Sequence, residues 1–122
     1  MARKIDLSTL KKDDIPIISL TGVTYLIPGN FKTEYSLKLF ETMDKVKEAK
    51  SKNDVQRTYA ILKQWVYELL LMNVEGTYID DESGKEVKVT HKKVTKETVE
   101  KEFNDYQVIE LLLSEILALA NE

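Results

Sequence analysis

The chain has 122 residues, of which 43% are hydrophobic and 32% charged, and its formal net charge is −3. This length and composition suit one domain with its own core, and the lack of cysteine excludes disulfides and thiolate metal sites. The mild negative charge gives no reason to expect nucleic acid or an anionic membrane as the main partner.

The N-terminal part of the chain has the composition of β structure. Residues 15–20 and 23–27 are rich in β-branched and aromatic side chains, and Thr21-Gly22 between them predicts a tight hairpin turn. Pro16 lacks the donor that a β-ladder needs, so we expect it at a strand start or on an edge strand. Apolar and polar residues also alternate over 5–8, which could add a short third strand.

The next two elements are predicted to be helices. Apolar residues at helical spacing indicate a first helix over 33–49, and a broader apolar face indicates a second over 55–73. Ser51, Asn53 or Asp54 can cap the second helix, because a short polar side chain there can accept a free backbone N–H.

The character of the sequence then changes over residues 74–94. The turn-forming run at 80–84 separates the segments TYI and EVKVT, which could pair as an exposed hairpin or form a mobile loop. Thr95, followed by Glu97, indicates the start of a short helix that continues to Phe103.

The last helix is expected over residues 106–120, with Asn104 or Asp105 as its cap. Its apolar side chains cover well over half of the circumference, whereas an ordinary surface helix has an apolar stripe roughly 100° wide. Either the other helices wrap this helix completely, or part of its surface belongs to a partner. Glu110 and Glu115 interrupt it, and it is shorter than the ~20 apolar residues that span a bilayer.

Together these elements predict an α+β fold, with a mainly α-helical body of three to four helices and a small N-terminal antiparallel β-hairpin or sheet. The single domain over 1–122 comprises a β-hairpin region (1–30), two helices (31–73), a charged loop or hairpin (74–94), and a short helix plus the apolar C-terminal helix (95–122). The N-terminus is charged where an export signal needs an apolar core, so we expect a cytoplasmic protein.

No pattern of catalytic or metal-binding residues is apparent. The only histidine, His91, lies in a hydrophilic stretch, which favours a solvated surface role over catalysis. The acidic run over 80–86 places Gly84 at the fifth position, whereas a calcium loop needs glycine at the sixth, so a plain turn is favoured. The four glycines are scattered and form no phosphate-binding loop. We therefore predict that the chain is not an enzyme and holds no cofactor and no metal.

One basic cluster is present, formed by Lys85, Lys88, Lys92, Lys93 and Lys96. Nucleic-acid surfaces usually add arginines and stacking aromatic residues. Here arginine is absent and acidic residues intervene, so a solvated loop is favoured over a binding patch.

Three segments suggest a family. They are KIDLSTL near the N-terminus, the hairpin ISLTGVTYLIPGNF that leads into a helix, and TKETVEKEFNDYQVIELLLSEIL near the C-terminus. In this order the chain resembles the tail assembly chaperones of long-tailed phages and related prophages. The resemblance implies a small, mostly helical protein of the host-cell cytoplasm that forms homo-oligomers. It also implies that the chain binds the tape-measure protein, keeps it soluble and helps to recruit tail-tube protein.

The resemblance supplies a client for the apolar C-terminal helix, because a tape-measure chain exposes long apolar helical faces until the tube encloses them. Helix-in-groove packing would cover such faces. We expect client or oligomer contacts at Val108, Leu111, Leu112, Glu115 and Leu119, and core positions at Ile109, Leu113, Ile116 and Leu117. In the alternative interpretation, all of these residues belong to the core.

Two other functions stay open from the sequence. The chain could be a stable virion component, such as a neck or tail-completion protein, which would form a ring and remain in finished particles. It could also be a small regulatory module whose N-terminal strands dimerise and whose residues 85–96 touch DNA. The mild acidity and the missing arginines weigh against the second of these.

Overall fold

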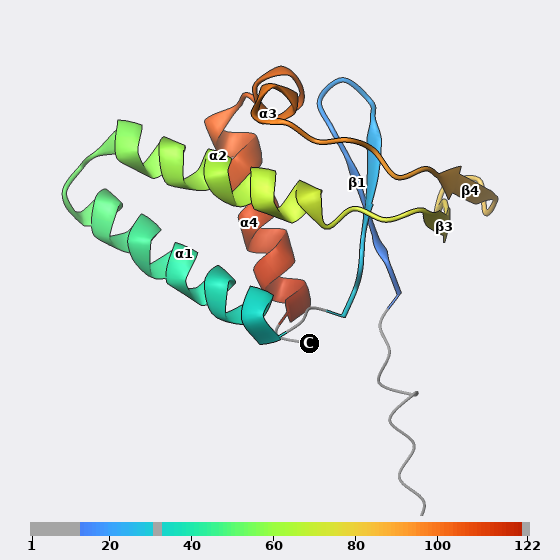
Figure 1. Cartoon of the computed structure of the whole chain (residues 1–122), viewed down its shortest axis with the longest axis horizontal. Coiled ribbons are helices and arrows are strands. Elements are labelled where there is room, and N and C mark those ends of the chain that lie inside the picture. Colours follow the sequence, from blue (N-terminus) through green and yellow to red (C-terminus); the bar gives the residue numbers. More distant parts are fainter. Residues whose placement is uncertain (1–12, 31–32, 121–122) are drawn as a thin grey trace, which may run out of the picture.

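Four helices and two antiparallel strand pairs form an α+β fold in the part of the chain that the computed structural model describes, residues 13–30 and 33–120 (Figure 1). The elements follow in the order β1 (Ile15–Ile18), β2 (Thr24–Ile27), α1 (Thr33–Ser51), α2 (Val55–Leu71), β3 (Gly76–Ile79), β4 (Glu86–Val89), α3 (Lys96–Glu102) and α4 (Tyr106–Ala120). The predicted fold class is therefore confirmed. The third strand expected over 5–8 lies outside the described residues.

β1 and β2 pair as the expected N-terminal hairpin. Gly22 in its turn has a φ of +88°, a left-handed conformation that costs other residues about 1–2 kcal/mol. β1 ends two residues earlier than predicted, because the turn already begins at Ser19, whose N–H donates to the carbonyl oxygen of Val23 at 2.9 Å and whose carbonyl oxygen accepts the N–H of Gly22 at 3.0 Å. The backbone N–H of Leu20 points away from β2 and donates to the carbonyl oxygen of Glu102 at 3.0 Å. Pro16 lies in β1, which among the described strands pairs only with β2, so the prediction of an edge position is confirmed.

α1 and α2 form an antiparallel helical hairpin (Figure 1). Of the three candidate caps, Asp54 is the one that caps α2, since its Oδ1 accepts the backbone N–H of Arg57 at 3.0 Å. Asn53 has a φ of +54°, which asparagine tolerates better than most residues. Compared with the prediction, α1 continues two residues further and α2 ends two residues sooner.

α2 lies at the centre of the core, because it contacts α1, α3, α4 and β2. Its buried face is formed by Thr58, Leu62, Trp65, Val66, Leu69 and Leu70. β2 is buried on both faces. Tyr25 and Ile27 join the main core, while Leu26 on the opposite face is covered by Gly76 at the start of β3. The N-terminal hairpin is thus held between the helices and the second hairpin.

Of the two structures considered for residues 74–94, a hairpin or a loop, the structure has a hairpin. Its strands β3 and β4 project away from the helices (Figure 1). Its turn is closed by Asp80, whose backbone N–H donates to the carbonyl oxygen of Lys85 at 2.9 Å. Gly76 permits a close approach between the two hairpins, because a Cβ at this position would lie 2.7 Å from Cδ2 of Leu26.

The side chain of Asn73 fastens the segment after β4 to the end of α2. Its Nδ2 donates to the carbonyl oxygens of Leu70 at 2.7 Å and Lys92 at 2.9 Å, and its Oδ1 accepts the backbone N–H of Lys92 at 2.8 Å. Only 4% of Asn73 is exposed. A buried amide with three such bonds orders the path from β4 to α3, since each backbone group that it satisfies is costly to leave unpaired.

Both C-terminal helices begin at the predicted caps. Thr95 and Thr98 exchange side chain-to-backbone hydrogen bonds at the start of α3, and Oδ1 of Asp105 accepts the backbone N–H of Val108 at 3.1 Å at the start of α4. Among the described residues, no helix combines the length and the hydropathy needed to cross a bilayer.

Candidate protein-binding surface

One face of α4 belongs to the core. Ile109, Leu113 and Ile116 are buried, and Leu117 is half-buried against the same cluster. The spacing of three and four residues places these side chains on one side of the helix. The core positions predicted for α4 are therefore confirmed, with Leu117 at the margin of the core.

The five predicted contact residues lie together on a neighbouring side of α4, again at spacings of three and four residues. Leu111 is 62% exposed and Glu115 is also exposed. Val108, Leu112 and Leu119 are half-buried, and Leu112 packs against the core. The surface thus consists of one exposed leucine beside a row of half-buried apolar side chains.

The remaining side of α4 is attached to the α1–α2 hairpin by polar and aromatic contacts. Lys50 Nζ lies 2.7 Å from Glu110 Oε2, and this hydrogen bond raises the pKa of the lysine. The ring of Tyr106 meets that of Tyr59 edge-on, with 5.7 Å between the ring centroids. These contacts hold α4 against the hairpin while leaving Leu111 directed to solvent.

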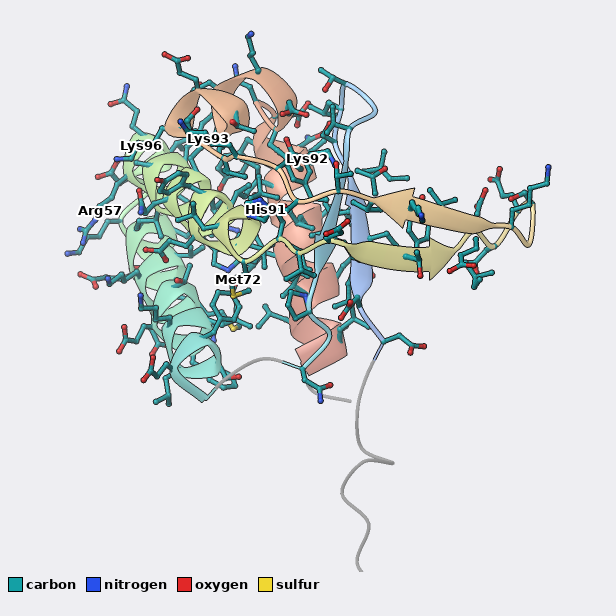
Figure 2. All side chains as sticks on the ribbon, turned by 45° about the vertical axis from the view of Figure 1, so that its right-hand side comes forward. Arg57, Met72, His91, Lys92, Lys93 and Lys96 are labelled. Atoms are coloured by element: carbon teal, nitrogen blue, oxygen red, sulfur yellow. The ribbon has the colours of Figure 1, made fainter. Side chains whose placement is uncertain are left out.

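The lysine cluster of the sequence does not form one patch in the structure. Lys85 and Lys88 belong to the projecting β3–β4 hairpin, whereas Lys93 and Lys96 lie beside the helices (Figure 2). Lys92 points toward the N-terminal hairpin, where its Nζ lies 5.7 Å from the centroid of the Tyr25 ring. Lysines that are close together in the sequence therefore lie on separate parts of the folded chain.

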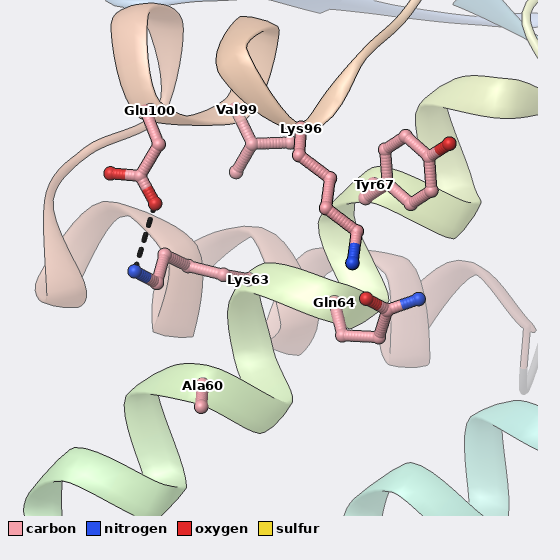
Figure 3. Close-up of a pocket in the computed structure, with 7 residues that line it drawn as sticks. All are labelled: Ala60, Lys63, Gln64, Tyr67, Lys96, Val99 and Glu100. Atoms are coloured by element: carbon pink, nitrogen blue, oxygen red, sulfur yellow. Dashed lines mark hydrogen bonds and ion pairs between the residues drawn. The ribbon is translucent and has the colours of Figure 1, made fainter.

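A shallow groove of about 210 Å³ lies between α2 and α3 (Figure 3). It is lined by Ala60, Lys63, Gln64, Tyr67, Lys96, Val99 and Glu100. The Lys63 ammonium and the Glu100 carboxylate, 2.9 Å apart, form an ion pair across it. The groove has mixed charge, and its lining contains no nucleophile next to a general base.

The carboxylate oxygens of Asp80 form hydrogen bonds within the turn of the β3–β4 hairpin. Asp80 Oδ1 accepts the backbone N–H of Glu82 at 3.2 Å, and Asp80 Oδ2 accepts the hydroxyl of Ser83 at 3.0 Å. Within residues 13–30 and 33–120, no three histidine or carboxylate side chains are placed to hold a metal ion together. His91 lies exposed on the surface.

Glu102 accepts several long-range hydrogen bonds that the sequence did not predict. Its Oε1 accepts the hydroxyls of Ser19 at 3.0 Å and Thr21 at 3.2 Å, and its Oε2 accepts the hydroxyl of Tyr25. One carboxylate on α3 therefore fastens β2 and the turn of the N-terminal hairpin. No local pattern marks such a residue, because its partners are about 80 positions away in the chain.

Stability should fall as the pH rises above about 10, the usual tyrosine pKa. Burial raises the pKa of Tyr25, and the hydrogen bond to Glu102 adds to the shift. Burial likewise raises the pKa of Tyr35, against an opposing effect of Trp65. The unfolded chain loses these protons at a lower pH than the folded chain, so their contribution is fully present below about pH 10 and is lost above it.

Urea unfolding near neutral pH and at about pH 11 measures this loss. A Tyr35→Phe variant should lose less stability than the original chain between the two conditions, which separates the tyrosine effect from deprotonation of the lysines. An equal loss in both proteins would show that Tyr35 keeps an ordinary pKa in the folded state.

Comparison of the chain with protein-family models, with curated proteins and with solved structures finds no match. The surface of α4 and the resemblance of the sequence to tail assembly chaperones are therefore the features that bear on function.

Proposed function

We propose that this chain is a tail assembly chaperone of a long-tailed phage or prophage. It would act in the host-cell cytoplasm, without catalysis, by binding an apolar helical client, the tape-measure protein, on the outward side of α4. The observation that carries the proposal is the 62% exposure of Leu111 beside half-buried Val108, Leu112 and Leu119. A contiguous exposed apolar patch is typical of a protein-binding site, and helical spacing places Leu111 next to the other three apolar residues.

The chemistry of this surface suits a reversible contact. Burying apolar surface contributes ~25 cal/mol per Å² before the costs of association. Because Val108, Leu112 and Leu119 are already half-buried, only part of their surface is left for a partner. The contact should therefore be of moderate affinity, as a chaperone needs if its client is to be released into the growing tail tube.

The same surface has a polar margin that can fix the orientation of a client helix. Glu115 is exposed within the row of candidate residues, and Ser114 and Ala118 extend the exposed side of α4. Small side chains allow a second helix to approach closely, while a carboxylate can select a basic residue on it. A client helix that packs along α4 would then contact Leu111 near the middle of α4.

The proposal requires that a long helical tape-measure protein is encoded beside this chain, and co-expression with that protein tests it. We expect the client to be insoluble alone and to become soluble in a complex with this chain, recovered on a tag and weighed by light scattering after gel filtration. The physical reason is that the apolar helical face of the client is covered by α4 instead of by other copies of the client.

The control is co-expression of the client with a chain in which Leu111 and Glu115 are both replaced by lysine. Both side chains are exposed, so the variant should fold and yet fail to solubilise the client. A client that stays insoluble with the original chain, while that chain elutes as a lone monomer, would contradict the proposal.

A further inference from the structure

A second surface lies where the two hairpins cross, away from α4. A groove of about 580 Å³ runs between the start of β1 and the outer side of β3. It is lined by Asp13, Asp14, Pro16, Thr77, Tyr78, Ile79 and Asp81. The groove therefore combines a proline, an aromatic ring and an isoleucine with three carboxylates.

The groove is a fixed product of the fold, because the close contact of Gly76 with Leu26 sets the position of β3 against the N-terminal hairpin. The backbone N–H of Val74 donates to the carbonyl oxygen of Leu26 at 2.8 Å and holds the same crossing. Both walls are thus anchored to β2, the buried strand of that hairpin.

The charge of the lining has one sign. Every charged residue of the groove is an aspartate, and the described residues offer no group of three carboxylates or histidines that could hold a metal ion there. Carboxylates that share a groove attract positive charge, and their attraction is screened by salt over a Debye length of about 10 Å at 0.1 M. The groove is therefore complementary to lysine or arginine side chains.

Apolar side chains at and beside this groove are exposed to solvent. Ile79 is 60% exposed in the groove, and Ile18, on the same face of β1 as Pro16, is 62% exposed. Strand addition along β1 is disfavoured, because Pro16 has no N–H and the N–H of Leu20 already donates to Glu102. An occupant would be held by its side chains instead of by a β-ladder.

We propose that this groove binds a segment of another protein in which lysine or arginine residues alternate with apolar residues. The basic side chains pair with Asp13, Asp14 and Asp81, and an apolar side chain between them covers Ile79 and the ring of Tyr78. The proposal does not depend on the function assigned to α4.

A fluorescent peptide in which lysine alternates with leucine is the probe, and its anisotropy is measured during titration with the full-length protein. We expect saturable binding that weakens with added salt, and no binding of the matched peptide with glutamate in place of lysine. Replacing Asp13, Asp14 and Asp81 together by asparagine should weaken binding roughly tenfold, because exposed charge pairs contribute modestly but add up. Ile79→Ser should weaken it several-fold.

The matched control changes three exposed acids of α1 in the same way, as Glu34→Gln, Glu41→Gln and Asp44→Asn. This triple variant has the same net charge as the groove variant and should bind like the original chain. Equal weakening in both triple variants would overturn the proposal, since binding would then follow net charge alone. Absence of saturable binding would also overturn it.

Peptide titration and sedimentation distinguish two other occupants. If replacing Arg3, Lys4, Lys11 and Lys12 by serine strengthens peptide binding to the original groove but not to the groove variant, the basic N-terminal segment of this chain is the occupant and the proposal is wrong. If the original chain self-associates in sedimentation and the groove variant does not, a second copy is the occupant, which also overturns it.

Discussion

Replacing Ile116 by alanine should lower the free energy of unfolding by about 2–5 kcal/mol, whereas Leu111→Ala on the same helix should change it by less than about 1 kcal/mol. Ile116 is 1% exposed and lies in the main core with Ile109 and Leu113, so its truncation leaves a cavity. Leu111 is 62% exposed and leaves none. Urea unfolding of the two variants and the original chain measures the difference.

This comparison uses two aliphatic residues of one helix, so helix propensity has a similar effect on both values. Equal destabilisation by the two variants would mean that Leu111 is packed against another part of the chain or another copy. The outward surface of α4 would then not be available to a client.

Asn73→Ala should be the most damaging polar substitution, lowering the free energy of unfolding by about 2–4 kcal/mol. It removes three hydrogen bonds from a site that is 4% exposed, and it leaves the backbone N–H and carbonyl of Lys92 without that partner. The loss also frees the segment between β4 and α3, so amide exchange should accelerate there before it accelerates in α2.

The exposed asparagine of the α3–α4 connection provides the control. Asn104 accepts one hydrogen bond, from the hydroxyl of Tyr59, so Asn104→Ala should cost less than about 1 kcal/mol by the same urea measurement. A similar cost for both substitutions would show that the amide of Asn73 does not fasten the β4–α3 segment to α2.

Local patterns were sufficient to predict most of the secondary structure. The hairpin turn and the caps Asp54, Thr95 and Asp105 each depend on chemistry within a few residues. The caps are observed as predicted, and the turn is observed with Leu20 included beside the predicted Thr21-Gly22. The α+β class follows from the order of such elements. The choice between a hairpin and a loop over 74–94 was not available from the sequence, because it depends on how β3 packs against Leu26.

Long-range contacts account for what the sequence did not predict. The backbone N–H of Leu20, just after β1, bonds to Glu102, which lies about 80 residues further along the chain. The roles of Asn73 and Glu102 depend on partners that no periodicity reveals. The groove between the hairpins has the same origin, since its walls come from two segments about 60 residues apart.

For the candidate surface, helical periodicity separated the core side of α4 from its outward side. It did not distinguish exposed Leu111 from half-buried Val108, Leu112 and Leu119, because the burial of each side chain depends on which neighbouring elements pack against it. Exposure along α4 had to be observed in the folded chain.

The most direct test of the α4 surface is the affinity of the purified client for two serine variants. Leu111→Ser changes α4 and Leu37→Ser changes α1, and the two leucines have nearly equal exposure, 62% and 59%. We predict that Leu111→Ser weakens client binding roughly tenfold or more, as expected when a leucine that becomes buried in the complex is lost. Leu37→Ser should bind like the original chain. Unchanged binding by Leu111→Ser, or equal losses in both variants, would contradict the assignment of the client surface to α4.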